Sequence, residues 1–482
     1  MRFRRTHVKK IRMKLRYFSL ILCSLFIYGA QSAKQSSIPE RLQVSENRRF
    51  LVDQDGRPFF YLADTAWEIF QRLDREEADE YLRDRVEKGF TAVQIMTLVE
   101  HEGLRTPNVY GHLPLTDEDP TRPDVKDGPD NDYWDHADYI IRRANELGLY
   151  VALLPTWGSF WHDKNLQRFT PQNARTYGEW IGHRYRDAKI IWVMGGDRNP
   201  ENDYHRDIIR AMAEGVRKGD GGNHLITYHP GGGRGSADFF HHEPWLDFNM
   251  RQNGHNHWYE IYAKTRSDYD REPVKPVIDG EPIYEDHPIS FDASHRGYSV
   301  AADCRRAIYW DLFNGACGHT YGHHAVWQFY KPGVRYPINH PLMHWHEAIQ
   351  QPGASQVRHA RHLIESRPIL TRIPATERIV VQPDDDKGYM PGEGLTHIAA
   401  TMDEEGTYMM VYIPVGRRFA LRTSVLAEGK LKGWWFDPRT GHSHSAGRIE
   451  RGDSISFLSP TPVEETDWVL VIDVASRGYK KP

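Results

Sequence analysis

The sequence predicts an α/β protein in two parts, a (β/α)8 TIM barrel followed by a small antiparallel β-sandwich. Between about Pro58 and Phe329, eight short apolar runs alternate with stretches of helical pattern. Such alternation over roughly 270 residues is typical of a barrel of parallel strands. From about Ile369 onward, short β-rich runs separated by turns indicate a sandwich. A doubly wound sheet would also alternate, but no glycine-rich phosphate loop follows the first run.

The eight barrel strands are predicted where the chain is continuously apolar, because parallel strands are buried on both faces. In chain order the runs are FFYLAD, TAVQIMTL, YVALLPTW, KIIWVMGGD, LITYHP, LDFNMRQNG, KPVIDGE and GHTYGHHAVWQF. Helical patterns between them cover 132–147, 171–186, 204–218 and 299–314, whereas the connection from the fifth run to the sixth is only weakly helical. After Phe329, a last barrel helix and a linking helix are expected. We therefore assign 33–365 to the barrel with its linking helix.

The carboxyl-terminal sandwich is predicted for 366–482. Its first element is the hairpin candidate HIAATMDEEGTYMMVYIP, which turns at Glu405 and Gly406. The runs RFALRTSVL, LKGWWFDPRTG, SISFLSP and WVLVIDV follow. We expect the barrel to carry the chemistry and the sandwich to support it.

Residues 1–32 have the features of a signal peptide. A basic leader precedes an apolar run from about Tyr17 to Tyr28, and the small residues Ala30 and Ser32 suit signal peptidase. The run is short for a membrane span. Cys23 lies inside it, but Leu20 to Leu22 lack the small residues that a lipoprotein signal favours, so no lipid anchor is expected. We predict an exported protein, periplasmic or extracellular, with no stable membrane span after cleavage.

Charge and cysteine content narrow the possible functions. Removal of residues 1–32 leaves 54 basic and 66 acidic residues, a net charge of about -12. No basic stripe is present, which argues against a nucleic-acid partner. Only Cys304 and Cys317 remain, and the sequence leaves open whether they form a disulfide or are two buried thiols.

Two acids stand just beyond predicted strands, Asp197 after the fourth and Glu281 after the seventh. The carboxyl ends of barrel strands open onto one pocket, so these side chains are expected to face each other. Two carboxylates in this arrangement are the minimum equipment for glycoside hydrolysis. The alternatives are a turn or helix-cap role for Asp197, an ion pair with neighbouring Arg198, and a surface or ion-paired role for Glu281.

Other strand-end side chains suit a saccharide pocket, in which aromatic faces pack on sugar C–H groups and polar groups bind hydroxyls. The predicted substrate-binding residues are Asp64, Trp67, His101, Trp157, Arg198, His229, Gln252, His255, Tyr284, Tyr321, His323 and Trp327. No metal or other cofactor is predicted, because none of the close histidine pairs has the spacing of H-E-x-x-H. No G-x-S-x-G elbow for a serine nucleophile occurs either.

Five blocks give the chain a resemblance to a known family. RFLVDQDGRPFFYLADTAWEIF, VMGGDRNP, VIDGEPIYE, TYGHHAVWQF and QPGASQVRHARHLIESRP together resemble the apiosidase-like enzymes of glycoside hydrolase family 140. The resemblance implies a secreted bacterial (β/α)8-barrel enzyme with a collagen-binding-type β-sandwich at its carboxyl terminus. It matches Asp197 to the catalytic Asp and Glu281 to the catalytic Glu. Asp64 and Trp67 match a GDTAW-like block, which here reads ADTAW.

The resemblance also implies a reaction and a substrate. By analogy with related retaining barrels, Asp197 is the general acid/base and Glu281 the nucleophile. The implied target is an apiose linkage of the pectic polysaccharide rhamnogalacturonan II, so that Arg198, Arg234, Arg251 and Arg335 are candidates for binding galacturonate carboxylates. The alternatives are a retaining glycanase of other pectic or hemicellulosic specificity and a non-catalytic carbohydrate-binding protein.

Overall fold

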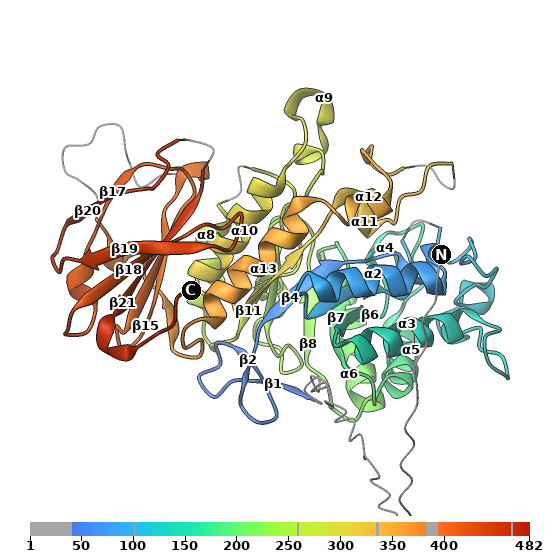
Figure 1. Cartoon of the computed structure of the whole chain (residues 1–482). Coiled ribbons are helices and arrows are strands. Elements are labelled where there is room, and N and C mark those ends of the chain that lie inside the picture. Colours follow the sequence, from blue (N-terminus) through green and yellow to red (C-terminus); the bar gives the residue numbers. More distant parts are fainter. Residues whose placement is uncertain (1–40, 101, 258–259, 334–336, 382–393, 464–465) are drawn as a thin grey trace, which may run out of the picture. The chain divides into compact units, whose positions relative to one another are not determined.

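The computed structural model describes residues 41–100, 102–257, 260–333, 337–381, 394–463 and 466–482 (Figure 1). Its main sheet confirms the predicted barrel, with strands in the order β8-β7-β6-β5-β4-β12-β11-β10-β9. The eight parallel strands are β4 (Tyr61–Thr65), β5 (Ala92–Met96), β6 (Tyr150–Leu154), β7 (Ile190–Gly195), β8 (Ile226–His229), β10 (Asn249–Gln252), β11 (Val277–Asp279) and β12 (Gly318–Tyr321). The short β9 (Arg234–Gly235) pairs antiparallel with β10. Asp247 N–H donates to Ile226 O at 2.9 Å, so the two ends of the sheet nearly close.

The helices lie where the sequence pattern predicts them. The four predicted stretches correspond to α3 (Tyr133–Leu147), α5 (Pro171–Arg184), α6 (Asp203–Gly219) and α10 (Ala301–Phe313). Side-chain caps fix three of the starts, because Asp132, Thr170 and Asn202 each accept a backbone N–H of the first turn. Further barrel helices are α1 (Ile69–Arg72), α2 (Arg75–Glu87), α4 (Ser159–His162), α8 (Ile261–Tyr269), α9 (Ala293–Arg296), α12 (Trp345–Ala348) and α13 (Pro352–Glu365). The weakly helical fifth connection holds only β9 and α7 (Ala237–Phe240).

Two segments differ from the predicted strands. The run 318–329 is strand only to Tyr321, and it continues as helix α11 (His324–Trp327), whose start is capped by His323 Nδ1, which accepts Ala325 N–H at 3.1 Å. A short buried apolar run does not distinguish strand from helix, which explains the error. The run 59–64 begins in an amino-terminal antiparallel sheet of β1 (Leu42–Val44), β2 (Leu51–Asp53) and β3 (Pro58–Phe59).

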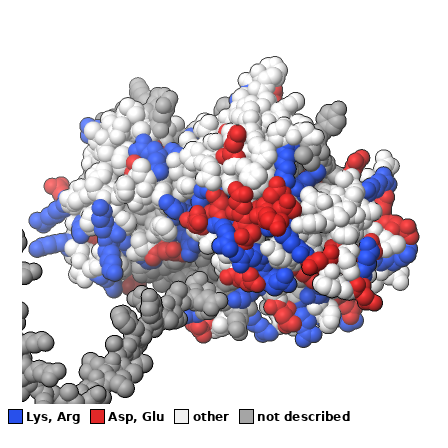
Figure 2. Space-filling model, turned by 45° about the vertical axis from the view of Figure 1, so that its right-hand side comes forward, with Lys and Arg blue, Asp and Glu red and all other residues white. Residues whose placement is uncertain are grey.

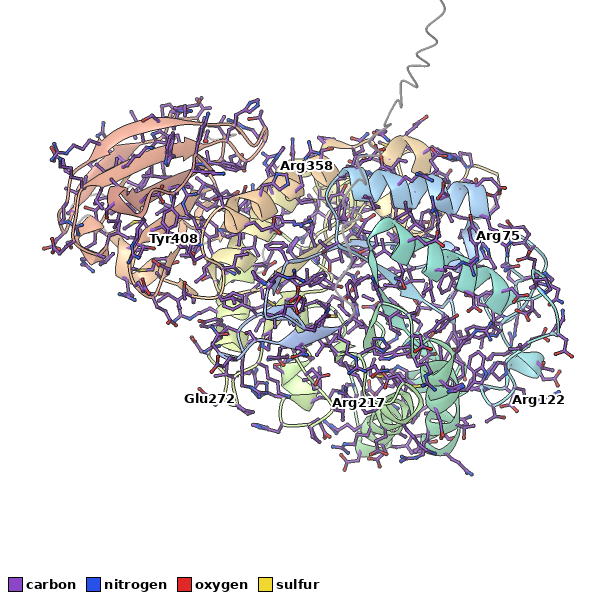
Figure 3. The ribbon with its side chains drawn as sticks, turned by 60° about the horizontal axis from the view of Figure 1, so that its bottom comes forward. Arg75, Arg122, Arg217, Glu272, Arg358 and Tyr408 are labelled. Atoms are coloured by element: carbon purple, nitrogen blue, oxygen red, sulfur yellow. The ribbon has the colours of Figure 1, made fainter. Side chains whose placement is uncertain are left out.

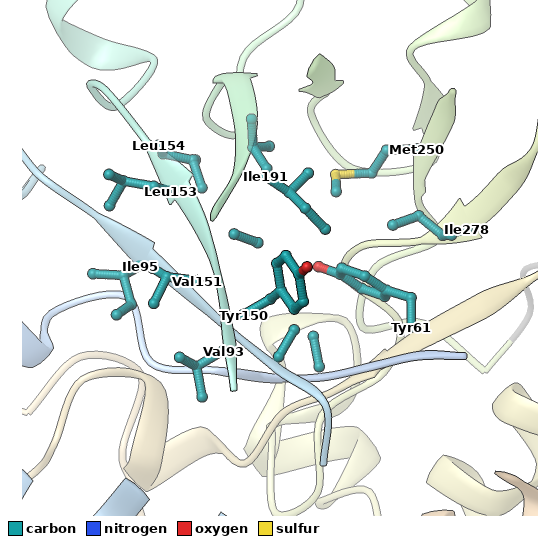
Figure 4. Close-up of a cluster of buried hydrophobic side chains, with 14 of the residues drawn as sticks. Tyr61, Val93, Ile95, Tyr150, Val151, Leu153, Leu154, Ile191, Met250 and Ile278 are labelled. Carbon is teal, nitrogen blue, oxygen red and sulfur yellow. The ribbon is translucent and has the colours of Figure 1, made fainter. Parts of the chain in front are cut away.

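The barrel interior is filled by side chains of its strands. Figure 4 shows Tyr61, Tyr150, Ile191, Met250 and Ile278 converging from five different strands, and all five are at most 1% exposed. This packing requires apolar residues along both faces of each strand, which is why the runs are continuous. The polar residues that follow the strands are left at the rim, where the chemistry is expected.

The carboxyl-terminal domain consists of two antiparallel sheets with a core between them, as predicted. One sheet has the order β13-β15-β16-β21-β18-β19 and the other β14-β17-β20. The strands are β13 (Arg372–Pro374), β14 (Val380–Val381), β15 (Ala399–Asp403), β16 (Tyr408–Ile413), β17 (Arg418–Leu421), β18 (Leu431–Phe436), β19 (Ser443–Ile449), β20 (Ile455–Leu458) and β21 (Trp468–Val474). The hairpin turn at Gly406 is confirmed, with φ of 67°. Strand β19 was not predicted, because residues 443–449 are mostly small or polar.

A buried ion pair and a ring contact join this domain to the barrel. Arg305 of α10 binds Asp467 through two contacts of 3.0 Å, and the Tyr309 ring of α10 stacks on that of Tyr412 with centroids 4.7 Å apart. At the start of the domain itself, Arg367 binds Asp473 through two contacts of 2.8 Å. Tyr408, labelled with Arg358 of α13 in Figure 3, donates its hydroxyl to Pro368 O at 2.7 Å. A bidentate pair between a planar guanidinium and a carboxylate fixes the relative orientation of the two side chains as well as their distance.

The structure also describes the surface charge and the state of the two cysteines. On the face shown in Figure 2, basic side chains are interspersed with acidic ones and form no continuous stripe. Cys304 and Cys317 are both buried free thiols, so the disulfide alternative does not hold. Within the described ranges, no helix combines the length and apolarity that crossing a membrane requires. The predicted signal peptide lies outside the described residues.

Candidate active site

A cavity of about 510 Å³ opens at the carboxyl ends of the barrel strands, and both predicted catalytic acids line it. Its described lining comes from the carboxyl ends of the eight parallel strands, β4 to β8 and β10 to β12, and from the loops that follow them. The lining residues are Trp67, Met96, Glu100, Trp157, Asp197, Gly232, Gln252, Gly254, His255, Asn256, Glu281, Tyr284, His287, Ser290, Phe291, Trp327, Ile338 and Asn339. Two acids 84 positions apart in the chain therefore share one open site, the arrangement required by glycoside hydrolysis.

A sharp backbone turn directs Asp197 to the cavity. Gly195, Gly196 and Asp197 all have positive φ, of 93°, 103° and 57°. At Gly195, a Cβ would lie 2.5 Å from His229 O, so only glycine fits there. Asp197 adopts the left-handed conformation that few non-glycine residues accept, a local cost often found at functional sites. The two glycines thus allow a buried strand to deliver a carboxylate at its own end.

The surroundings of Asp197 favour its protonated form. Burial, followed by the negative charge of Glu281, raises the pKa of Asp197 to about 6. Gln252 opposes this shift, since its Nε2–H donates to Asp197 Oδ1 at 3.0 Å. Arg198 also opposes it, with Nη1 3.5 Å from Asp197 Oδ2. Arg198 makes closer contacts with Glu100 and Asp163, at 2.7 and 3.1 Å, so its charge is shared among three acids.

Glu281 has the opposite tendency. Burial disfavours its charge, but hydrogen bonds and charge from His229 and His255 overcome this and hold the pKa of Glu281 well below its usual range. His229 Nε2 lies 3.1 Å from Oε2, and His255 Nε2 lies 3.1 Å from Oε1. The Glu281 backbone N–H also donates to Asp279 Oδ1 at 3.1 Å. One site therefore contains a carboxyl group poised to give a proton and a carboxylate held ionised.

The structure brings most of the predicted substrate-binding residues to the cavity. Those that line it are Trp67, Trp157, Gln252, His255, Tyr284 and Trp327. His229 lies behind Glu281, fully buried, with its ring centre 5.4 Å from that of Trp67. Arg198 flanks Asp197 without lining the cavity. Both contact a catalytic candidate and so belong to the site.

Three predicted substrate-binding residues do not reach the cavity. Asp64 is fully buried, where it binds Arg85 at 3.1 Å and accepts the Tyr81 hydroxyl at 2.6 Å. Tyr321 donates to Glu285 Oε2 at 2.5 Å, and His323 caps α11. Each of these residues lies at a strand end, but its side chain forms hydrogen bonds or an ion pair with residues that do not line the cavity. His101 lies outside the described residues.

Of the arginines that were candidates for binding carboxylates, neither Arg234 nor Arg251 lines the cavity. Arg251 forms a buried pair with Asp268, with Nη1 2.6 Å from Oδ2. Arg234 is exposed on β9 and does not line the cavity, and Arg335 lies outside the described residues. The described charged lining consists of Glu100, Asp197 and Glu281, with the imidazoles of His255 and His287 beside them.

Several lining residues were missed by sequence reasoning. His287, Ser290, Phe291, Ile338 and Asn339 come from irregular loops after β11 and β12. The His287 ring stacks on that of His255 with centroids 3.9 Å apart, which fixes the histidine that contacts Glu281. These loops lack the periodic spacing of apolar residues by which a sequence indicates helices and strands, so their residues could not be assigned to the site. Glu100, in contrast, follows a predicted strand, and its strand-end position already indicates that it lies near the pocket.

The comparisons with known proteins agree with this geometry. A family model described as "Apiosidase-like, catalytic domain" matches residues 45–371. The chain belongs to the apiosidase-like glycoside hydrolases. A second model, "Putative collagen-binding domain of a collagenase", matches residues 383–473.

Solved structures support the assignment over nearly the whole chain. One, titled "Glycoside hydrolase", is 32% identical, with a TM-score of 0.83, over 91% of this chain and 98% of the other. A glycoside hydrolase family 5 protein from Bacteroides vulgatus ATCC 8482 is 30% identical, with a TM-score of 0.84, over 92% and 96%. Comparison with curated proteins gives no match. This apiosidase-like protein is therefore a glycoside hydrolase with a carbohydrate substrate, and the non-catalytic alternative is set aside.

Proposed function

We propose that this glycoside hydrolase is a retaining enzyme that cleaves an apiose linkage of rhamnogalacturonan II, with Asp197 as general acid/base and Glu281 as nucleophile. The observation that carries the assignment of roles is that the surroundings shift the pKa values of the two acids in opposite directions within one cavity. Asp197 has its pKa raised to about 6, whereas that of Glu281 is lowered. Paired carboxyl groups whose surroundings push their pKa values apart take the acid and anion roles respectively.

In the first step, Asp197 protonates the glycosidic oxygen while a Glu281 oxygen attacks the anomeric carbon. The bond to the leaving sugar breaks, and a glycosyl ester forms on Glu281. In the second step, the Asp197 carboxylate takes a proton from water, the water oxygen attacks the same carbon, and Glu281 is released. His229 and His255 each lie 3.1 Å from one Glu281 oxygen, and they stabilise the charge that returns to it.

The cavity walls suit a sugar ring. Trp67, Trp157, Tyr284 and Trp327 line the cavity and can make aromatic contacts with sugar C–H groups, and Gln252 and His255 beside them can bind hydroxyls. A cavity of about 510 Å³ holds a small number of sugar residues. The apiose assignment rests on the family, whereas the acid pair would serve other linkages equally well. We further propose that the enzyme is exported, on the strength of residues 1–32.

The roles are tested with Asp197→Ala and Glu281→Ala on a nitrophenyl glycoside and on an unactivated oligosaccharide. Asp197→Ala should lose about 10²–10⁴-fold of kcat/KM on the oligosaccharide and much less on the nitrophenyl glycoside, whose leaving group needs no acid. Azide should restore its turnover and give a glycosyl azide of retained configuration. With Glu281→Ala, azide should give the inverted product.

The opposite stereochemistry for the two variants would exchange the roles. If both variants lose their fold, seen as a fall in Tm, the two acids have structural roles and not catalytic ones. The substrate is tested by analysing the products that the wild-type enzyme releases from rhamnogalacturonan II. Release of apiose-containing products is expected, and activity on other pectic or hemicellulosic glycans alone would contradict the apiose assignment.

A further inference from the structure

A group of three potential metal ligands lies on the loops beside Asp197 and is not used by the proposed reaction. His162 ends α4, Glu201 precedes α6, and His205 lies in the first turn of α6. One ligand atom from each of the three lies within 4.8 Å of the others. We propose that these residues form a binding site for a divalent transition-metal ion of the zinc class, separate from the catalytic acids.

The contacts of His162 indicate which ring nitrogen is available. Its Nδ1 lies 2.8 Å from Asp163 Oδ1. Arg198 contacts the same carboxylate, with Nη2 3.1 Å from Asp163 Oδ2. With Nδ1 directed to Asp163, Nε2 is the ring nitrogen that faces Glu201. A carboxylate bonded to the second nitrogen of a histidine is the usual outer support of a metal-binding imidazole.

The second contact of His162 brings a carboxylate to its other ring nitrogen. Nε2 lies 3.4 Å from Glu201 Oε1. A protonated imidazole makes this contact an ion pair, whereas with a neutral ring the two atoms offer lone pairs to one shared cation. Ligand atoms at about 2.0–2.2 Å from a tetrahedral zinc ion are roughly 3.4 Å apart, so the observed pair already has the spacing of one coordination edge.

His205 supplies the third ligand from the opposite side. Its ring centroid lies 4.8 Å from that of His162, at an angle of 47°. The buried Trp161 ring contacts both histidines, with centroids 5.6 and 5.7 Å away. The Glu201 side chain is 70% exposed, so an ion can enter from solvent and retain water as its fourth ligand.

An ion held here would join the loop after β6 to the loop after β7, on which Asp197 lies. Trp161 Nε1–H donates to Gly195 O at 3.1 Å, at the start of the Asp197 turn. Asp163 contacts Arg198, which lies 3.5 Å from the Asp197 carboxylate. The ligands are therefore positioning residues for the turn, and binding should raise Tm because the ion favours the folded chain.

The test is direct metal binding, with no sugar present. Mature protein, freed of any affinity tag, is titrated with ZnCl₂ in a calorimeter and with CoCl₂ by visible absorption, and one ion per chain is expected. His162→Ala and His205→Ala should each weaken binding about 100-fold or more, and Asp163→Asn about 10–100-fold. Glu201→Gln, at an exposed position, should weaken binding without affecting the fold.

The matched control removes another pair of imidazoles. His344 and His346 lie 4.8 Å apart but stack at 13°, so their nitrogens do not converge. The double variant His344→Ala/His346→Ala should bind zinc as the wild type does. Lack of saturable binding of either ion by the wild type, or equal binding by His162→Ala and His205→Ala, would overturn the site. Neither result would bear on the roles of the catalytic acids, because no step of the reaction is measured.

Discussion

The hydrogen bond from Gln252 to Asp197 sets where activity should fall as the pH rises. Asp197 must be protonated to donate to the leaving oxygen, so activity should decline through its pKa of about 6. The Gln252 amide donates to Oδ1 at 3.0 Å and thereby stabilises the charged form. Gln252→Met removes the donor and keeps the side-chain length. The pKa of Asp197 should rise, and the alkaline limb of the pH profile should move with it.

The size of the shift follows from the value of one hydrogen bond to a charged group, about 1.5–3 kcal/mol. One pKa unit corresponds to about 1.36 kcal/mol. The Asp197 side chain is 38% exposed, so solvent screening favours the lower end of that range. We expect the limb to move up by about 1 unit, from about 6 to about 7.

The assay is kcat/KM against pH on an unactivated oligosaccharide, since a good leaving group would not need the acid. Met96→Leu is the control, because Met96 lines the same cavity and the exchange conserves volume. The comparison uses the pH at which the alkaline limb falls and not the peak activity, because Gln252 lines the cavity and its replacement also changes contacts with the sugar. A limb that stays in place or moves to lower pH, in a folded variant, would refute this reasoning.

Three further predictions concern the acids and the core. His255→Ala removes one of the contacts that keep Glu281 ionised, so the acid limb of kcat/KM should move to higher pH; an unmoved limb would show that His229 alone suffices. Burial raises the pKa of Asp311 to about 7, so the folded protein retains a proton that an unfolded carboxyl of pKa 3.8 releases, and this stability is lost as pH rises through about 7. Urea unfolding at pH 5 and pH 8 should therefore show a fall for the wild type that is roughly 2 kcal/mol larger than for Asp311→Asn, and equal falls would contradict it. Arg85→Met leaves the fully buried Asp64 without its ion-pair partner and should cost about 3–5 kcal/mol of unfolding free energy, whereas a change below 1 kcal/mol would place Asp64 outside that pair.

Local patterns were sufficient to predict the elements. Continuous apolar runs of the length of strands, with helical patterns between them, gave all eight barrel strands and the helices α3, α5, α6 and α10. The two acids were found for the same reason: a strand that is buried on both faces must end where polar residues begin. Three segments were not predicted correctly: 322–329, where a buried helix and a buried strand share the same apolar composition, the start of the run 59–64, which belongs to β3, and the mostly polar β19.

The sequence by itself determined the barrel, the sandwich and the approach of Asp197 and Glu281 to one rim, because strand period and parallel order place strand ends together. Only the tertiary structure decided which strand-end residues reach the cavity. Asp64, Tyr321 and Trp67 all lie at or just after strand ends, yet the first two are held away from the cavity by Arg85 and Glu285. Partners far apart in sequence compete for each polar side chain, and the protonation of Asp197 and Glu281 is likewise set by neighbours that no local pattern names.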